Sequence, residues 1–385
     1  MDNENIEREE VEKKKKLKLK APFVTLLKTL GVLCVIAVAI FIFYLYQISI
    51  FTDLGYSKES SKFILFNNLK SYVVSVGENK TLNVAFESKY YKKENLEIYQ
   101  NIKYVDQDNF IKNINALIKK GYSSSNINMI FAHGNSEDVT EFAKRDKVRY
   151  LEEFYSLSYA KLNLYDRYIA YSDETGEDDE TTVLIVNLDI DKPDYTDPKP
   201  VTKFGTDMLV NKHRQLSSEF VPDDLVTIST EYAREDDTMA SKVAVDAFIE
   251  MSNAAKSEGY GLIINSAYRS YQDQTDLCEY YRNLYGDDYV SRYVAQPGFS
   301  EHQTGLGFDI GSTTSNIFLN SKEYGWMEEN AYKYGFILRF PKKYVSITGF
   351  NTEPWHYRYV GKEIATYIHE NDMPYEEYYA MFLDN

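Results

Sequence analysis

Residues 300–309 read Ser-Glu-His-Gln-Thr-Gly-Leu-Gly-Phe-Asp, and residues 353–356 read Glu-Pro-Trp-His. The chain has only five histidines, and two of them, His302 and His356, stand in these segments among glycines, aromatic residues and carboxylates. Asp309 closes the first segment and Glu353 opens the second. Two imidazoles and one carboxylate form the ligand set of a catalytic zinc site, because three protein ligands leave the fourth position of the metal open for water.

Glu353 has a different expected role. It precedes His356 by three residues, and Pro354 between them limits the freedom of the backbone. This spacing can place a carboxylate beside the metal, whose bound water becomes acidic, so Glu353 is the predicted general base. The remaining histidines are expected to be ordinary polar residues rather than ligands: His133, His213 and His369.

Other interpretations of these residues stay open at this point. Asp309 could simply end a strand, and Glu353 could pair with Arg358. Two histidines and one carboxylate also bind iron in oxygenases. Those enzymes usually separate the first histidine from the acid by one residue, whereas six residues lie between His302 and Asp309. Hydrolysis therefore fits the spacing better.

The surrounding segments predict an α+β domain over residues 206–385, with helices flanking an antiparallel sheet. Residues 239–256 have apolar positions at helical spacing and end before Gly259, and Ser270 with Asp273 forms a capping box for the following helix. Short apolar runs predict the strands at residues 261–267, 307–310, 336–340 and 356–359.

The N-terminal part of the chain predicts a membrane anchor. Residues 30–50 are almost wholly apolar, and a helix over residues 29–50 is long enough to cross about 30 Å of hydrocarbon. Six lysines lie between Lys13 and Lys20, which predicts a cytoplasmic tail over residues 1–28 and an outward-facing remainder. A cleaved signal peptide is the alternative, but apolar residues continue beyond the candidate site at Ala37–Ala39.

Between the anchor and residue 206, two further regions are expected. Residues 51–170 have a polar-faced helical pattern and predict a helical spacer domain, in which Ser57 and Ser123 cap two helices that start alike. Residues 171–205 are expected to contain an acidic loop at 173–180, a strand that includes 183–186, and an extended linker.

Composition limits the class of partner. The 385-residue chain carries a formal charge of −16, which argues against a nucleic-acid partner because phosphate binding needs a basic surface. The two cysteines, Cys34 and Cys278, lie on opposite sides of the apolar stretch and are not expected to pair. The 35 tyrosines are consistent with genome composition or with a carbohydrate-stacking surface.

Three motifs in order resemble the VanY-type D-alanyl-D-alanine carboxypeptidases, which are related to D-Ala-D-Ala dipeptidases and to L,D-carboxypeptidases. These motifs lie at residues 266–274, 297–309 and 353–361. The resemblance implies zinc on His302, Asp309 and His356, with Glu353 as the base. It further implies that Arg269 reaches the scissile carbonyl oxygen and that Gln274 and Ser300 contact the substrate. The chain departs from commoner forms at three positions, Ala267, Phe299 and Gly307.

The expected protein is therefore a bacterial, membrane-anchored zinc peptidase whose catalytic domain lies outside the cytoplasm. Its expected reaction is removal of the terminal D-alanine from peptidoglycan stem peptides. One alternative keeps the chemistry and changes the substrate, as an L,D-carboxypeptidase acting on tetrapeptides. The other is an inactive wall-binding scaffold, which the complete set of ligands and base disfavours.

Overall fold

The computed structural model describes residues 21–384, and its first element is one long helix, α2 (Ala21–Asp53). The stretch Phe23–Asp53 counts 31 residues, and most of its large apolar side chains are exposed. At 1.5 Å per residue this length exceeds the roughly 30 Å of membrane hydrocarbon. The helix is long and apolar enough to span a membrane. The predicted basic tail at Lys13–Lys20 lies outside the described residues.

The first of two compact units ends at Val148 and continues from α2 with short helices. Both predicted caps are confirmed: the Ser57 side chain accepts from the amide of Ser60, and Ser123 forms a capping box with Asn126. The helices after α2 are α3 (Lys58–Phe66), α4 (Lys70–Val76), α5 (Lys80–Glu87), α6 (Leu96–Tyr99), α7 (Phe110–Lys119), α8 (Ser124–Ala132) and α9 (Ser136–Phe142).

The second unit begins at Arg149 with three more helices, α10 (Leu151–Tyr155), α11 (Tyr165–Thr175) and α12 (Asp179–Asn187). The strand predicted at residues 183–186 is wrong, because these residues lie in α12 and all four side chains are buried. A short apolar run fits a buried helix as well as a strand, and here Asp178 starts a helix by accepting from the amide of Thr181. The acidic stretch is mostly helical too, since α11 and α12 enclose it.

A buried tyrosine–asparagine clasp joins α11 to α12. The Tyr168 hydroxyl donates to Asn187 Oδ1 at 2.5 Å and accepts from the amide of Lys161 at 2.9 Å. Asn187 Nδ2 in turn donates to the carbonyl of Tyr159 at 2.8 Å. Neither Tyr168 nor Asn187 has exposed surface, so the clasp satisfies polar groups that would otherwise be buried without partners.

The same clasp recurs in the first unit. The Tyr99 hydroxyl donates to Asn115 Oδ1 at 2.5 Å and accepts from the amide of Lys92 at 3.2 Å, while Asn115 Nδ2 donates to the carbonyl of Tyr90 at 2.6 Å. The segments share the pattern Tyr-x-Lys followed by Tyr seven residues later. The helical region thus contains a repeated module, of which one copy belongs to the second unit.

The centre of the second unit is a four-stranded antiparallel sheet of order β5-β6-β8-β7. Helix α13 (Lys242–Ser257) covers it, and the Phe248 ring packs edge-on against Phe308 at 5.9 Å and Phe336 at 6.4 Å. The predicted α+β class with an antiparallel sheet is confirmed. The strands are β5 (Leu262–Ser266), β6 (Gly307–Ser312), β7 (Phe336–Phe340) and β8 (Glu353–Tyr359).

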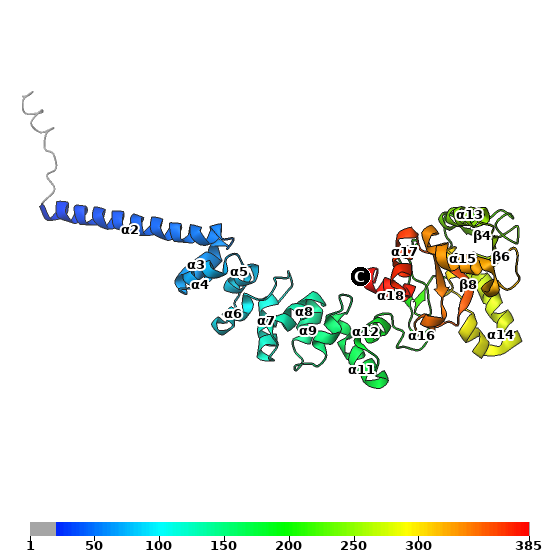
Figure 1. Cartoon of the computed structure of the whole chain (residues 1–385). Helices are drawn as coiled ribbons and strands as arrows, with labels where there is room; N and C mark the ends of the chain where they lie inside the picture. Colours follow the sequence, from blue (N-terminus) through cyan, green and yellow to red (C-terminus); the bar gives the residue numbers. More distant parts are fainter. Residues whose placement is uncertain (1–20, 385) are drawn as a thin grey trace, which may run out of the picture. The chain divides into compact units, whose positions relative to one another are not determined.

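Further elements surround the sheet, and Figure 1 shows α13 and α14 well separated within this unit. The predicted capping box at the start of α14 is confirmed, since the Ser270 side chain accepts from the amide of Asp273. These elements are β1 (Lys199–Pro200), β2 (Arg214–Gln215), β3 (Leu225–Thr227), β4 (Met239–Ser241), α14 (Tyr271–Tyr293), α15 (Lys322–Asn330), α16 (Val345–Thr348), α17 (Lys362–Asn371) and α18 (Tyr375–Phe382).

Breaking the clasp is expected to destabilise the second unit. Asn187→Ala leaves the buried Tyr168 hydroxyl without its acceptor and should lower the free energy of unfolding by about 2–3 kcal/mol. Urea unfolding of the full chain in detergent, followed by tryptophan fluorescence, measures it, because Trp326 and Trp355 are the chain's two tryptophans and both lie in this unit. The exposed Asn371→Ala should change it by about 0.5 kcal/mol or less. Equal unfolding of the Asn187 variant and the wild type would contradict this.

Candidate metal centre and active site

Sheet register places Asp309 and His356 side by side. Asp309 on β6 and His356 on β8 are direct partners across the antiparallel pair, so their side chains stand on one face of the sheet. Asp309 Oδ1 lies 3.3 Å from His356 Nδ1. Two residues that are 47 positions apart in the chain therefore meet without any loop having to position them.

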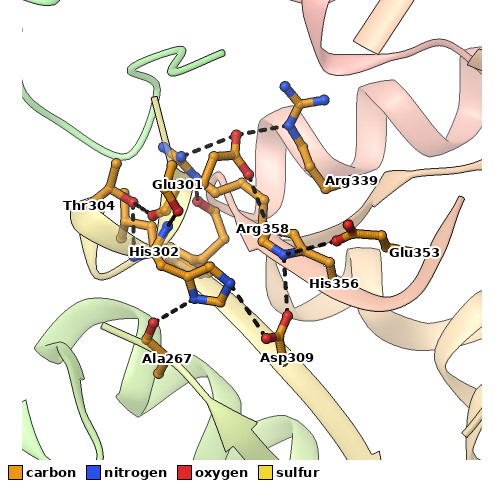
Figure 2. A network of polar contacts seen from close by, with 12 residues as sticks. Ala267, Glu301, His302, Thr304, Asp309, Arg339, Glu353, His356 and Arg358 are labelled. Atoms are coloured by element: carbon orange, nitrogen blue, oxygen red, sulfur yellow. Dashed lines mark hydrogen bonds and ion pairs between the residues drawn. The ribbon is translucent and has the colours of Figure 1, made fainter. Parts of the chain in front are cut away.

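His302 approaches from the 3₁₀ turn η3 (Glu301–Thr304), which directly precedes β6. Ser300 caps this turn by accepting from the amide of His302, and Gly305 ends it with a φ of 68°. His302 Nδ1 lies 2.6 Å from the carbonyl oxygen of Ala267, which fixes the ring. The other ring nitrogen, Nε2, then faces Asp309 Oδ2 at 3.5 Å, as Figure 2 shows.

These three residues fit a divalent metal. One ligand atom from each of His302, Asp309 and His356 lies within 4.8 Å of the others. Asp309 Oδ1 is buried without a hydrogen-bond partner, which is costly unless a cation is bound there. Two imidazole nitrogens and a carboxylate oxygen are donors that suit zinc. Among the described residues, this is the one such cluster of histidine, cysteine and acidic side chains.

The charge states of the three differ in the metal-free protein. Burial opposes ionisation of Asp309, but the two facing histidines hold its pKa well below the usual range. Burial lowers the pKa of His302, and the nearby Arg269 lowers it further. Burial also disfavours the charged form of His356, yet the carboxylates of Asp309 and Glu301 raise its pKa to about 9. The metal-free cluster therefore has an anionic Asp309 and a protonated His356, and a metal bound at this site would displace a proton from His356.

Glu353 stands at the start of β8, beside the cluster. Its carboxylate lies 3.8 Å from His356 Nδ1, and burial raises its pKa to about 7. A carboxyl group with such a pKa can exchange protons near neutral pH. The alternative pairing of Glu353 with Arg358 is not formed, because Arg358 Nη1 instead lies 3.4 Å from Glu301 Oε1.

A buried network of charged residues contacts His356 at Nε2. The sequence analysis did not predict this network. Glu301 Oε1 lies 2.8 Å from Arg339 Nε, and Arg339 also pairs with Glu376 of α18 at 2.6 Å (Figure 2 labels Glu301, Arg339 and Arg358). The side chains of Arg339, Glu376 and Arg358 have no exposed surface. Two arginines thus balance two glutamates. The one available signal was Glu301, which precedes the ligand His302 directly.

Glu301 reaches His356, a candidate metal ligand, through its second oxygen. Glu301 Oε2 lies 3.4 Å from His356 Nε2, and both atoms are buried without another hydrogen-bond partner. The two atoms face one another, so a proton on Nε2 points at a carboxylate. Such a contact holds the ring and leaves Nδ1 free for a metal.

Arg269 lies at the edge of the same cavity. Its guanidinium donates to Gln274 Oε1 at 2.7 Å and to Ser266 Oγ at 3.1 Å. Among the described contacts it does not pair with Asp273 or Asp276 of α14, since Asp273 caps that helix and Asp276 accepts from Gln272. The guanidinium is thereby oriented by neutral partners and keeps its charge for a ligand.

The predicted site residues gather in one pocket of about 260 Å³. Gln274 is buried and donates to the carbonyl of Ala295 at 2.7 Å, and Trp355 forms part of the wall with 41% of its surface exposed. The lining includes Arg269, Gln274, Ser300, His302, Asp309, Glu353, Trp355 and His356.

The other three histidines lie elsewhere. His133 caps the end of α8 in the first unit, and the His369 ring stacks on Tyr332 at 3.8 Å. His213 is buried, with Nε2 3.8 Å from Asp194. None belongs to the metal-ligating cluster found among the described residues.

Comparison with known proteins agrees with this geometry. The family model described as D-alanyl-D-alanine carboxypeptidase, VanY, matches residues 237–362. YodJ of Bacillus subtilis (strain 168), a predicted carboxypeptidase, is 43% identical over 179 residues, which cover 44% of this chain and 66% of that protein. The D-alanyl-D-alanine carboxypeptidase of Enterococcus faecium is 35% identical over 182 residues, covering 45% and 57%. The chain spans less than two thirds of either relative.

Among solved structures, VanYB in complex with D-alanine-D-alanine is 31% identical to this chain. The match includes 45% of this chain and 96% of VanYB, with a TM-score of 0.40. The chain belongs to the VanY family. Another family-related structure, the L,D-carboxypeptidase LdcB, is 42% identical and 85% covered, with a TM-score of 0.43. A VanY variant from the VanB-type resistance cassette, solved with Zn(II), is 32% identical and 98% covered, with a TM-score of 0.39.

The contact between Glu301 and His356 predicts a role in metal affinity within this VanY domain. Glu301→Gln removes the charge that faces the His356 ring and should weaken zinc binding by about 10- to 100-fold. Competition against a chromogenic chelator measures this directly, without substrate. Glu323→Gln is the matched control, because Glu323 is equally buried but bonds to Gly261 and Thr314 instead of a ligand. Zinc affinity within about twofold of wild type in Glu301→Gln would contradict the assignment.

Proposed function

We propose that this protein is a zinc-dependent D-alanyl-D-alanine carboxypeptidase that removes the terminal D-alanine from peptidoglycan stem peptides. The observation that carries the proposal is the convergence of a two-histidine, one-aspartate cluster, a buried glutamate and an oriented arginine in one pocket. The cluster supplies metal ligands, Glu353 supplies a proton acceptor, and Arg269 supplies a cation. These are the parts that peptide-bond hydrolysis by water requires.

In this proposal His302, Asp309 and His356 hold the metal. Zinc bound there would lower the pKa of a water molecule and polarise the carbonyl group of the substrate. Glu353 is placed to take a proton from the attacking water and to return it to the leaving amine, because its raised pKa of about 7 makes both transfers accessible near neutral pH. Its burial keeps bulk water from competing for that proton.

Arg269 would stabilise the negative charge that develops on the carbonyl oxygen. Gln274 and Ser266 hold its guanidinium at 2.7 and 3.1 Å, so the cation need not reorganise during the reaction. Gln274 is therefore supported first as a residue that orients Arg269. Ser300, which caps the turn carrying His302, is supported as a substrate contact only by its place in the pocket wall.

The long apolar helix supports a membrane anchor for the catalytic domain. We propose that residues 29–50 cross the membrane once, with residues 1–28 in the cytoplasm and the catalytic domain outside it. Residues 51–148 would then form a helical spacer. The helices α10, α11 and α12 belong to the compact unit that contains the candidate site, so the spacer expected to end at residue 170 and the linker expected at residues 171–205 do not match the units of the structure. The repeated tyrosine–asparagine clasp supports a modular spacer, whose last module packs with the catalytic unit.

An L,D-carboxypeptidase acting on tetrapeptides is the second candidate. It is favoured by the 42% identity to LdcB, a higher value than the 31% to VanYB. The proposed chemistry is the same in both, and the two differ in the residue before the scissile bond, which is a D-alanine in the pentapeptide and the L-configured third residue in the tetrapeptide. An inactive wall-binding scaffold is disfavoured, because the ligands, base and arginine are all present in one pocket.

The proposed reaction predicts which product appears. The zinc-loaded full chain in detergent should release D-alanine from a stem pentapeptide at least about tenfold faster than from a tetrapeptide, as measured by an enzyme-coupled D-alanine assay. Glu353→Gln should lower turnover by about 100-fold or more while zinc stays bound, because the amide cannot accept the proton. Preference for the tetrapeptide would support the L,D alternative. Full activity of the Glu353 variant would contradict the role of that residue.

A further inference from the structure

The chain folds back along the end of its long apolar helix. Helix α2 ends at Asp53, and α3 begins shortly after it at Lys58. Phe66, the last residue of α3, then meets Tyr44 of α2 with ring centroids 6.5 Å apart. Each ring lies about 12–14 Å along its helix from the turn, at 1.5 Å per residue. The two helices therefore form a short hairpin, and Figure 1 shows α3 beside the end of α2.

The closed end of this hairpin is packed and the open end is not. Ile48 and Phe51 of α2 are 9% and 2% exposed, whereas Tyr46 and Phe66 are 61% and 78% exposed. Exposure of a phenylalanine ring to water is unfavourable, and this ring continues the exposed apolar surface of α2 through its contact with Tyr44. The open end therefore needs a cover that the described residues do not supply.

Two polar residues indicate where hydrocarbon would begin and end on α2. The helix carries no charged residue between Lys28 and Gln47. These residues are nineteen positions apart, about 29 Å along a helix, which matches the roughly 30 Å of membrane hydrocarbon. Gln47 would thus mark the outer boundary, and Tyr44 would lie about 4–5 Å inside it. Phe66 contacts Tyr44, so its ring would lie just within the edge of the hydrocarbon.

A lysine lies at the same boundary, and the segment around it is basic. Lys70 Nζ donates to Gln47 Oε1 at 2.6 Å, a neutral partner that does not balance the lysine charge. Residues 54–103 contain eight lysines and five glutamates as their only charged residues, in a chain whose formal charge is −16. Cations at the level of the boundary, with an apolar ring below them, are complementary to lipid phosphate groups above hydrocarbon.

We propose that the hairpin of α2 and α3 rests in the outer interface of a phospholipid bilayer, with Phe66 at the edge of the hydrocarbon and Lys70 among the lipid phosphates. The proposal rests on the membrane anchor of the proposed function and adds a second point of contact to it. A single helix leaves the unit attached to it free to tilt. A contact through α3 instead fixes which side of the first unit faces the bilayer.

Quenching of tryptophan fluorescence by brominated lipids tests the proposal. The full chain carrying Phe66→Trp is placed in nanodiscs of phosphatidylcholine and phosphatidylglycerol, and the wild-type signal of Trp326 and Trp355 is subtracted. An indole fits at position 66 without repacking, because Phe66 is largely exposed. Lipids brominated near the headgroup should remove about half or more of the added signal, and lipids brominated at the chain end should remove less.

Two control variants separate this contact from the anchor. Glu141→Trp should show little quenching, because the Glu141 side chain is 60% exposed on α9, the last helix of the first unit. Val38→Trp lies midway between Lys28 and Gln47, so chain-end bromines should quench it most.

The pattern of quenching decides between the outcomes. Quenching at Val38 without quenching at Phe66 overturns this proposal and leaves the anchor standing, whereas quenching at neither position overturns both. Equal quenching at Phe66 and Glu141 also overturns it, since the contact would then not be specific to α3. Release of D-alanine from soluble pentapeptide by the same samples tests the catalytic function separately, because neither substitution lies in the catalytic unit.

Discussion

The pairing of β6 with β8 is the constraint on which the catalytic unit depends. It sets Asp309 opposite His356 and, in the same register, Phe308 opposite Tyr357. Because side chains alternate between the faces of a strand, a shift by one residue would turn Asp309 toward the core beneath α13 and Phe308 toward the pocket. The hydrophobic core and the metal ligands therefore enforce the same register. Fold stability and site geometry are two results of one pattern of hydrogen bonds.

Much of the site could be predicted from the sequence because its residues are concentrated in short motifs. His302 and Asp309 lie in one ten-residue segment, and Glu353 and His356 lie in another. Residues that are close in the sequence are brought together by local backbone geometry, so a short motif is enough to predict that they meet. The support from Arg339 and Glu376 could not be predicted in this way. They lie 38 and 75 positions after Glu301, and an arginine or glutamate in isolation is usually a solvated surface residue.

The fold was predicted well where local signals were unambiguous and poorly where they were not. Short apolar runs predicted the strands β6, β7 and β8, and cap residues such as Ser57 predicted the helix starts. Residues 183–186 were misjudged because four consecutive apolar residues do not distinguish a strand from a fully buried helix. The repeated clasp could not be predicted from spacing, because Asn115 and Asn187 follow loops of different length. The two asparagines therefore lie at different distances along the chain from their tyrosine partners.

The buried position of Glu376 has a consequence for how the enzyme matures. Arg339 and Arg358 balance Glu301 and Glu376, and without Glu376 one net positive charge would remain beside the candidate metal site. Glu376 is made twenty residues after the last ligand, His356. The nascent chain thus contains every ligand before it can balance the charge behind them. For the proposed zinc site, metal capture should consequently be a late event in synthesis, coupled to the docking of α18, and a partly made chain should be a poor competitor for the metal.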